Sequence, residues 1–279
     1  MSPPNEPRVV LCDSFDHMRA THIRLLDQAG AWGPVHVFLW SDDTVKALTG
    51  EAPKFPQEER LYYVQSIRYV REVTVVHGLP HEHALPESVD TRGTCWVVPQ
   101  DRDHPAKQAF AREHGLTYQV IARDRLDTFP AWTDDDPVTD CPDRPKVLVT
   151  GCYDWFHTGH VRFFEEVSEL GNLYVVVGHD RNIRLLKGDG HPMFGEQERR
   201  YIAGSIRFVK QALISTGNGW LDAEPEIKRI RPDIYAVNED GDKPVKRQFC
   251  EENGIRYVVL KRLPKPGLPR RESTHLRGF

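Results

Sequence analysis

Short apolar runs alternate with amphipathic stretches through the second half of the chain. Five apolar runs have the length of buried strands, and the segments between them repeat apolar residues with helical spacing. The pattern predicts strands at residues 146–150, 173–178, 208–214, 233–237 and 256–260. It predicts helices at residues 158–170, 196–205, 223–231 and 243–253, and a short helical turn at 181–186. This alternation favours a parallel sheet covered on both faces, and right-handed crossovers make it a doubly wound α/β sheet.

The same pattern occurs earlier in the chain in nearly constant register. An apolar run leads to Asp16 and His22 in the first half, and a matching run leads to Asp154 and His160 in the second. Further matched pairs are Arg60 and Arg199, Ser66 and Ser205, Arg68 and Arg207, Asp101 and Asp240, Lys107 and Lys246, and Tyr118 and Tyr257. The sequence therefore predicts a tandem duplication. We expect domains at residues 1–126 and 146–279, joined by a linker rich in proline and aspartate at residues 127–145.

Composition excludes several function classes. The 279 residues carry a net charge of -4, which is not the field of a nucleic-acid or membrane-surface protein. No apolar run is long enough to span a bilayer, and the N-terminus lacks the pattern of a signal peptide. The five cysteines include no C-x-x-C pair, so neither a disulfide frame nor a zinc knuckle is expected. We expect a cytoplasmic protein with no nucleic-acid and no membrane partner.

Residues 151–160, GCYDWFHTGH, join the first strand of the second copy to its first helix. A helix N-terminus presents unpaired N–H groups and partial positive charge, so it favours a phosphate. Gly159 has no Cβ to hinder a phosphate near the backbone. His157 and His160 could each donate a hydrogen bond to the same anion.

G-x-x-D-x-x-H-x-G-H after a strand resembles the nucleotidyltransferase superfamily that includes the cytidylyltransferases for choline phosphate, ethanolamine phosphate and glycerol 3-phosphate. The resemblance implies a five-stranded Rossmann-like sheet in each copy, with the site at the carboxyl ends of the strands. With two copies in one chain, the sequence resembles ethanolamine-phosphate cytidylyltransferase, which also has two copies. Because family members commonly work as dimers, we expect the two copies to form an intrachain pseudo-dimer. Whether two such chains associate further into a homodimer stays open.

The resemblance also implies roles for individual residues. The expected catalytic residues are His157, His160 and Lys187, the last to reach the phosphates or the acceptor. The expected nucleotide-binding residues are Gly151, Cys152, Tyr153, Asp154, Gly159, Asp240, Arg262, Ser273 and Thr274. The alternative role for Asp154 is capping of the helix start. No metal-ligating residues are expected, since Mg²⁺ usually arrives with the nucleoside triphosphate through phosphate oxygens.

Five arginines leave alternatives open. The signature arginine of the family precedes the Ser-Thr pair, and Arg262, Arg270 and Arg271 compete for that role. Arg199 and Arg207 match family arginines, but Arg60 and Arg68 recur in the first copy. That recurrence leaves nucleotide binding and a structural role equally open for Arg199 and Arg207.

The first copy departs from the motif where chemistry is expected. Arg19 and Thr21 replace one histidine and the motif glycine, while Asp13 and Ser14 replace Gly151 and Cys152. Thr49 stands in the place of Lys187, and we find no counterpart to the C-terminal Arg/Ser/Thr cluster. We therefore expect the first copy to be catalytically silent. The alternative is a ligand held through Asp16, Arg19 and His22.

The function that follows is nucleotidyl transfer. A cytidylyltransferase would couple CTP to a phosphorylated or phosphonate small alcohol or polyol and release pyrophosphate. The first alternative is an adenylyltransferase that uses ATP on a sugar phosphate or a cofactor precursor. The alternative from another class is a non-catalytic nucleotide-binding sensor.

Overall fold

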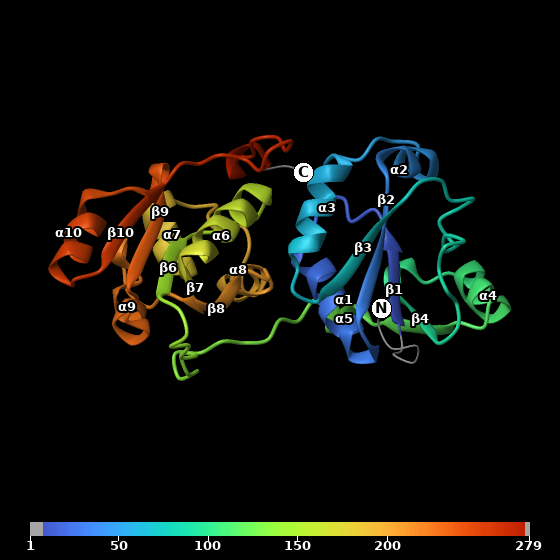
Figure 1. The fold of residues 1–279 in the computed structure, drawn as a ribbon, viewed down its shortest axis with the longest axis horizontal. Helices are drawn as coiled ribbons and strands as arrows, with labels where there is room; N and C mark the ends of the chain where they lie inside the picture. Colours follow the sequence, from blue (N-terminus) through green and yellow to red (C-terminus); the bar gives the residue numbers. More distant parts are fainter. Residues whose placement is uncertain (1–7, 277–279) are drawn as a thin grey trace. The chain divides into compact units, whose positions relative to one another are not determined.

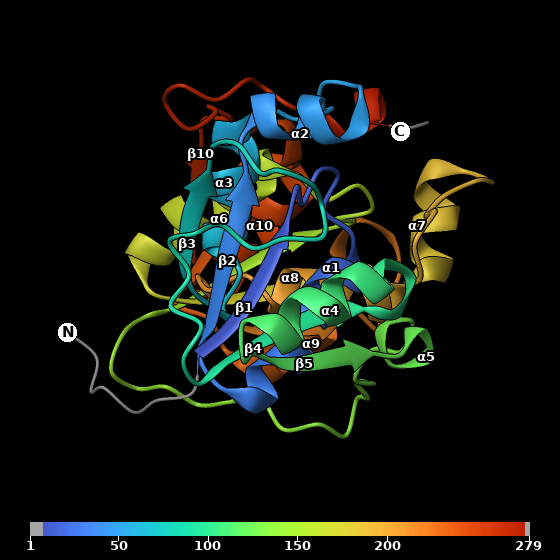
Figure 2. The same ribbon diagram turned by 90° about the vertical axis from the view of Figure 1, so that its right-hand side faces the viewer.

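The first half of the chain forms a compact α/β unit. The computed structural model describes residues 8–276, apart from the side chains of residues 274 and 275. Contacts divide the chain into two units, Met1–Thr128 and Phe129–Phe279. The first unit has strands β1 (Arg8–Asp13), β2 (Val35–Trp40), β3 (Val70–Val76), β4 (Thr94–Pro99) and β5 (Thr117–Ile121). Its helices are α1 (Ala20–Ala29), α2 (Asp42–Thr49), α3 (Gln57–Ser66), α4 (Pro105–Glu113) and α5 (Arg123–Leu126), and Figure 2 looks onto this sheet.

The second unit repeats that order of elements. Its strands are β6 (Lys146–Gly151), β7 (Asn172–Val177), β8 (Val209–Ile214), β9 (Ile234–Asn238) and β10 (Arg256–Leu260). Its helices are α6 (Thr158–Leu170), α7 (Asp180–Lys187), α8 (Glu196–Gly204), α9 (Glu224–Ile230) and α10 (Pro244–Glu252), as Figure 1 shows. The strand orders are β3-β2-β1-β4-β5 and β10-β9-β6-β7-β8, and all neighbouring strands are parallel. In both sheets the first strand is central, so the predicted pair of Rossmann-like sheets is confirmed.

Side chains of each strand alternate between the two faces of the sheet. On one face of the second sheet, Leu148 and Tyr174 pack with Ile227 of α9 and Cys250 of α10. Val147 and Val149 are fully buried and, by alternation, face the other side. The crossovers through α6 and α10 leave β6 and β9 in opposite directions across the sheet, so right-handed connections place them on opposite faces.

The predicted elements differ from the observed ones mainly at their ends. Most boundaries shift by one residue, because a terminal residue is assigned by a hydrogen bond that the hydropathy pattern does not report. The predicted turn at 181–186 is an eight-residue helix, α7, which ends at Lys187 rather than before it. Its first turn is capped by the imidazole of His179, which accepts a hydrogen bond from the backbone N–H of Asn182 at 3.2 Å. Histidine is an uncommon cap, which hid the start of this helix.

The segment predicted as a linker packs onto the second unit. Trp132 is 7% exposed and belongs to the core cluster of that unit. The backbone N–H of Trp132 donates to the side-chain oxygen of Gln197 at 2.9 Å, and the side-chain amide of Gln197 donates back to the carbonyl of Trp132 at 2.9 Å. Residues 129–145 contain neither helix nor strand, but they belong to the second unit. The pairing of the two copies as a pseudo-dimer stays a prediction.

The first unit lacks a counterpart of α9. Between β3 and β4 the chain runs through residues 77–93 without a helix. Leu85 is buried in the core there, and Leu79 and Val89 pack against it. Irregular chain with apolar anchors therefore replaces a helix on this face of the first sheet.

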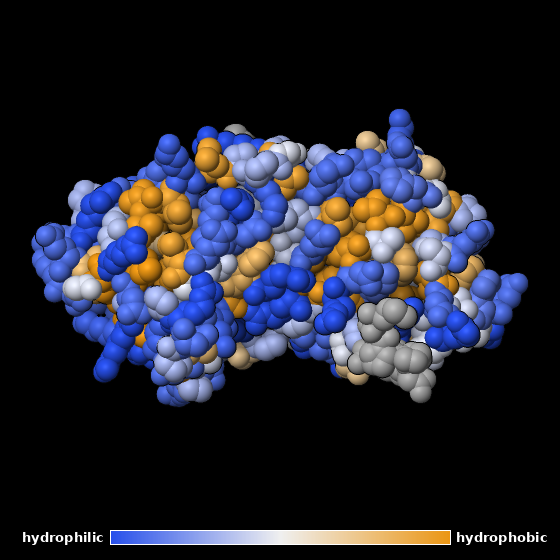
Figure 3. All heavy atoms as spheres, viewed as in Figure 1, coloured by the Kyte–Doolittle hydropathy of each residue, from blue (hydrophilic) through white to orange (hydrophobic). Residues whose placement is uncertain are grey.

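The surface of the protein is mostly hydrophilic, and hydrophobic residues interrupt it in the view of Figure 3. The exposed large hydrophobic residues of the described chain include Leu185, Met193 and Trp220. Across the part of the chain that the structure describes, no helix is long and apolar enough to cross a bilayer.

Each unit has a buried arginine, Arg60 or Arg199, which supports the equivalent corner of its own sheet. Arg199 is 0% exposed and donates to the carbonyl oxygens of Phe194 at 2.8 Å and Gly178 at 2.7 Å. It also pairs with Asp180 at 2.7 Å. Arg60 is 2% exposed and makes the equivalent contacts in the first unit, to the carbonyls of Phe55 and Trp40 and to Asp42. The shared network favours a structural role for Arg199, since the same contacts recur in the first unit, which lacks the complete motif.

We predict that replacing either arginine destabilises its own unit. Arg199→Met and Arg60→Met leave several carbonyls and a carboxylate unpaired, so each should lower the free energy of unfolding by about 3–5 kcal/mol. Urea denaturation measures the loss, and hydrogen exchange assigns it to one unit. Arg181→Met, on the exposed surface of α7, is the control and should change stability by less than about 0.5 kcal/mol. A destabilising effect of Arg199→Met alone would contradict the shared role.

Candidate active site

A cavity of about 480 Å³ lies at the carboxyl ends of the strands in the second unit. Its volume is in the range of small-molecule sites. Residues from the β6–α6 turn, α6, α7, the loop after β8, the end of β9, α10 and the C-terminal segment line it. Parallel α/β sheets bind ligands at this edge, at the point where the connections from two neighbouring strands leave in opposite directions. In this sheet the two strands are β6 and β9.

Helix α6 begins with two histidines whose rings are held by the backbone. The N–H of Gly159 donates to Nδ1 of His157 at 3.0 Å, and the N–H of His157 donates to Nδ1 of His160 at 3.3 Å. The two ring centroids are 4.0 Å apart, and both residues line the cavity. Because each Nδ1 accepts a hydrogen bond, the proton of each neutral imidazole lies on Nε2. The helix start therefore supplies two adjacent N–H donors.

Burial keeps these imidazoles uncharged. Desolvation, with the positive charges of Arg262 and Arg271, lowers the pKa of His157 to about 3. Desolvation and the neighbouring His157 lower the pKa of His160 well below its ordinary value. Nε2 of His157 is buried and has no hydrogen-bond partner among residues 8–276. A buried donor without a partner costs free energy, and an anion in the cavity would satisfy it.

The two motif glycines are required by their neighbours. A Cβ on Gly159 would lie 2.8 Å from the ring of His157, so the glycine makes room for that imidazole itself. A Cβ on Gly151 would lie 2.7 Å from the ring of Tyr153. Tyr153 has φ of 53°, a left-handed conformation that costs an aromatic residue free energy. The first copy has Arg19 in place of His157, which is why it can accept Thr21 in place of Gly159.

Asp154 holds the loop that follows α7. Its Oδ1 accepts the backbone N–H groups of Met193 at 2.8 Å and Phe194 at 3.0 Å. Asp16 accepts those of Lys54 and Phe55 at 2.8 and 3.0 Å in the first unit. A carboxylate that binds the same backbone in both units orients a loop in each. Oδ2 of Asp154 is buried without a hydrogen-bond partner in the described chain and lies 3.8 Å from Nδ1 of His191. Asp154 also lines the cavity.

Cys152 and Lys187 approach the cavity from two other elements. Cys152 follows β6, and its burial raises the pKa of the thiol. Lys187 is exposed at the end of α7, lines the cavity, and its charge acts on both Cys152 and His160. Asn182 fixes α7 to the loop after β8, because it exchanges hydrogen bonds with the backbone of Gly219 at 3.1 and 2.7 Å.

The C-terminal segment brings one of the competing arginines into the cavity. Arg262 follows β10, pairs with Asp240 at 2.8 Å and donates to the carbonyl of Arg271 at 3.3 Å. Arg262, Asp240 and Ser273 line the cavity, and Ser273 donates to the carbonyl of Trp155 at 3.2 Å. Arg270 and Arg271 line a smaller neighbouring hollow instead. Ser273–Leu276 is a 3₁₀ turn, and the side chain of Thr274 lies outside the described part of the chain.

Two expected binding residues do not line the cavity. Arg199 is buried in the network described above, and Arg207 is exposed after α8. Conversely, Asn182, Asp222 and Lys246 line the cavity without having been singled out from the sequence. Lys246 had one signal, its recurrence as Lys107, but burial of a lysine is not visible in a sequence.

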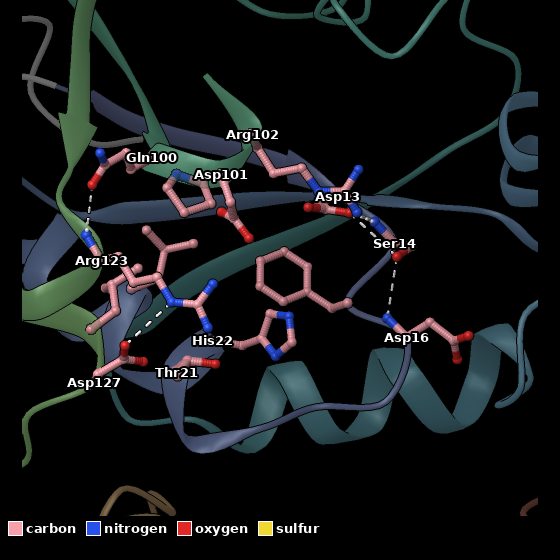
Figure 4. A pocket seen from close by; sticks show the side chains of 14 residues that line it. Asp13, Ser14, Asp16, Thr21, His22, Gln100, Asp101, Arg102, Arg123 and Asp127 are labelled. Atoms are coloured by element: carbon pink, nitrogen blue, oxygen red, sulfur yellow. Dashed lines mark hydrogen bonds and ion pairs between the residues drawn. The ribbon is translucent and has the colours of Figure 1, made fainter. Parts of the chain in front are cut away.

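The first unit has a smaller pocket at the equivalent place. It has a volume of about 200 Å³, and Asp13, Thr21, His22, Asp101 and Arg123 are among the residues that surround it in Figure 4. His22 keeps the ring orientation of His160, since its Nδ1 accepts the N–H of Arg19 at 3.0 Å. Asp16 and His22 line this pocket, whereas Arg19 does not.

Arg123 of the first copy is the counterpart of Arg262, one residue of the Arg/Ser/Thr cluster for which no counterpart was expected. Arg123 follows β5, and its N–H donates to the side chain of Gln100 at 3.0 Å. The N–H of Arg262 donates to Glu239 at 3.4 Å in the same way. The Arg123 side chain pairs with Asp127 at 3.3 Å rather than with Asp101. Arg123 and Arg262 have the same offset of 139 residues as Lys107 and Lys246, so the pair belongs to the register of the duplication.

Comparison with known proteins agrees with this geometry. The model of the family described as cytidylyltransferase-like matches residues 148–262. FAD synthase from Ferroglobus placidus is 32% identical over 119 residues, which cover 42% of this chain and 74% of that protein. FAD synthase from Pyrococcus horikoshii is 36% identical over 124 residues, which cover 43% of this chain and 80% of that protein.

A third relative extends over more of the chain. The bifunctional protein HldE from Campylobacter fetus is 23% identical over 223 residues, which cover 76% of this chain and 46% of that protein. The chain thus spans less than half the length of this relative. The predicted superfamily is confirmed by the family match and by the two FAD synthases. The chain belongs to the cytidylyltransferase-like family of nucleotidyltransferases.

Proposed function

We propose that the second unit transfers a nucleotidyl group from a nucleoside triphosphate to a small phosphorylated or phosphonate alcohol or polyol. An oxygen of the acceptor forms a bond to the α-phosphorus. The bond from the α-phosphorus to the bridging oxygen breaks, and pyrophosphate leaves with the electron pair. The observation that carries this proposal is the pair of neutral imidazoles, each with Nε2–H available, in a cavity at a helix N-terminus.

The acceptor is already an anion, so the reaction needs little proton abstraction. The main difficulty is charge that builds on the α-phosphoryl group while two anions meet. His157 and His160 would donate to the transferring phosphoryl group and the bridging oxygen, and Lys187 would neutralise the leaving phosphates. Gly151 and Gly159 would serve the site by making room for the rings of Tyr153 and His157. Ser273 would bind the phosphates, while Asp240 and Arg262 would bind the nucleoside side. Positioned donors in a site with little water are effective because they need not reorient.

Asp154, Cys152 and Tyr153 would shape the turn that receives the nucleotide. Mg²⁺ would arrive with the triphosphate. Among residues 8–276, no group of three or more His, Cys, Asp or Glu side chains could hold a metal ion. Phosphate oxygens would be the chief ligands of Mg²⁺, and Oδ2 of Asp154 could add one.

CTP is the nucleotide that the motif favours, and ATP is the second candidate. Support for ATP comes from the relatives named FAD synthase, because the dinucleotide FAD contains an adenylate joined through phosphate. Incubation with each triphosphate over a panel of phosphorylated alcohols, with pyrophosphate release as the readout, distinguishes the two. Release with CTP supports the first candidate, and release with ATP alone overturns it. Binding without release would favour a nucleotide sensor.

We predict that His160→Ala lowers kcat by about 10²–10³-fold, because it removes one donor to the developing charge. The matched control is His22→Ala, which removes the equivalent ring from the first unit and should leave kcat unchanged. Steady-state pyrophosphate release measures both. A comparable loss of kcat in His22→Ala would show that the first unit is not silent.

We also predict that the acid limb of the pH profile comes from the acceptor. A lowered pKa means that His157 and His160 stay neutral at mildly acidic pH, so kcat/KM for the triphosphate should change by less than about two-fold from pH 8 to 5.5. A phosphate acceptor with its second pKa near about 6 loses its dianion below that pH, so kcat/KM for the acceptor should fall. Initial rates with each substrate varied separately test this. With Mg²⁺ in excess, so that the terminal phosphate of the triphosphate stays ionised, loss of kcat/KM for the triphosphate around pH 6.5 would contradict neutral donors.

A further inference from the structure

Each unit buries one lysine beneath the end of its central strand. Lys107 of α4 is 6% exposed and Lys246 of α10 is 8% exposed. The ammonium of Lys107 lies 5.9 Å from the ring centroid of Trp96, and that of Lys246 lies 5.6 Å from the ring centroid of Tyr235. Burying an ammonium is costly unless hydrogen bonds and a counter-charge compensate it. The two units differ in how they provide that compensation.

The first unit supplies the counter-charge from its own chain. Lys107 donates to the carbonyl of Arg102 at 3.1 Å, and the carboxylate of Asp13 is the main negative charge that acts on it. Asp13 ends β1 and points toward the pocket in Figure 4, where its Oδ1 accepts the N–H of Ser14 at 2.6 Å. An anionic group is thus built into the first unit at the carboxyl end of its central strand.

The second unit has no charged side chain at the equivalent position. Gly151 ends β6 where Asp13 ends β1. The ammonium of Lys246 makes one long hydrogen bond, 3.3 Å to the hydroxyl of Thr150, and forms no ion pair within the described chain. Lys246 nevertheless lines the cavity. A nearly buried cation with one weak hydrogen bond is suited to an anion that arrives with a substrate.

The nearest opposing charge reaches Lys246 from another element. Asp222 follows the loop after β8, and its carboxylate is the main negative charge on Lys246. The hydroxyl of Ser215 donates to Asp222 at 2.7 Å, which fixes the carboxylate at the cavity wall. Asp222 and Lys246 thus face one space without touching, and a ligand with an anion and a hydrogen-bond donor could bind both.

The position of Lys246 separates it from the expected triphosphate site. His157 and His160 start α6 on one face of the sheet, whereas Lys246 belongs to α10 on the other. Transfer of a nucleotidyl group requires the attacking and leaving oxygens to lie on opposite sides of the phosphorus. With the leaving phosphates at the start of α6 and Lys187, the attacking group would come from the side of Lys246.

We propose that Lys246 binds the phosphate or phosphonate group of the acceptor and that Asp222 binds a hydroxyl or amino group of the same molecule. This inference rests on the proposed function, because it needs an acceptor that meets a nucleotide in this cavity. The anionic group of the acceptor then lies where the carboxylate of Asp13 lies in the first unit. The acceptor is then a small zwitterion or hydroxylated phosphate rather than an apolar one.

The test uses calorimetry of the full chain with two probes, methylphosphonate and 2-aminoethylphosphonate. The triphosphate site is filled with the α,β-methylene analogue of CTP or ATP, whichever binds, so that the probes report the acceptor side. Lys246→Met should weaken binding of both probes about 10-fold to 100-fold, the loss of a charge-assisted hydrogen bond. Asp222→Asn should weaken only 2-aminoethylphosphonate, because methylphosphonate has no donor for it.

Lys107→Met is the matched control, since it removes the equally buried lysine of the first unit. It should leave both probe affinities and the affinity for the triphosphate analogue unchanged. Equal probe binding by Lys246→Met and the unaltered chain, or no probe binding by the unaltered chain, overturns the inference while nucleotide binding is unaffected. If no triphosphate binds, the proposed function fails, and probe titration of the free chain still decides whether Lys246 holds an anion.

Once an acceptor is known, kinetics give a second readout. Lys246→Met should raise KM for the acceptor about 10-fold to 100-fold and leave KM for the triphosphate within about two-fold. A merely structural lysine would change both constants together or lower the amount of folded protein. Equal changes in the two KM values would overturn the assignment.

Discussion

Two backbone N–H groups at the start of α6 determine what the site can do. They bind Nδ1 of His157 and His160, so each ring is fixed and keeps its proton on Nε2. The same groups would otherwise be among the unpaired donors of a helix N-terminus. These backbone N–H groups therefore bind the two rings, and the rings present their own Nε2–H donors to the cavity. Burial keeps those side chains neutral, so they act by hydrogen bonding rather than by titrating.

The duplication makes the chain its own internal comparison. Both units keep the strand order, the buried arginine and the aspartate that holds the loop after the second helix. They differ at the end of the central strand, where one has Gly151 and the other Asp13, and at the first helix, where His157 is replaced by Arg19. Buried residues that keep the same contacts in both units therefore support the fold. The candidates for chemistry are His157 and Lys187, which only the second unit has, and shared residues that line its cavity, among them His160, Arg262 and Lys246.

Much of the fold followed from the sequence because parallel strands buried on both faces leave a clear apolar pattern. The strand–turn–helix position of residues 151–160 followed in the same way, whereas membership of the superfamily followed from the resemblance of their motif. The start of α7 did not, since His179 is an uncommon cap. The reason for Gly159 was also only partly visible: the glycine makes room for the ring of His157, a contact that needs coordinates. Burial of Lys246 depends on packing that hydropathy does not report. The match of Arg123 to Arg262 could have been found in the sequence, because it keeps the offset of the duplication.

The central claim is that both motif histidines are neutral and carry their proton on Nε2 in a site that receives a triphosphate. Two-dimensional ¹H–¹⁵N NMR of the imidazole nitrogens at neutral pH, with and without CTP or ATP, measures this directly. The account predicts Nε2–H tautomers for His157 and His160 in the free protein and a shift of both Nε2–H signals when the nucleotide binds. Imidazolium rings or Nδ1–H tautomers, or signals that ignore a bound nucleotide, would contradict it.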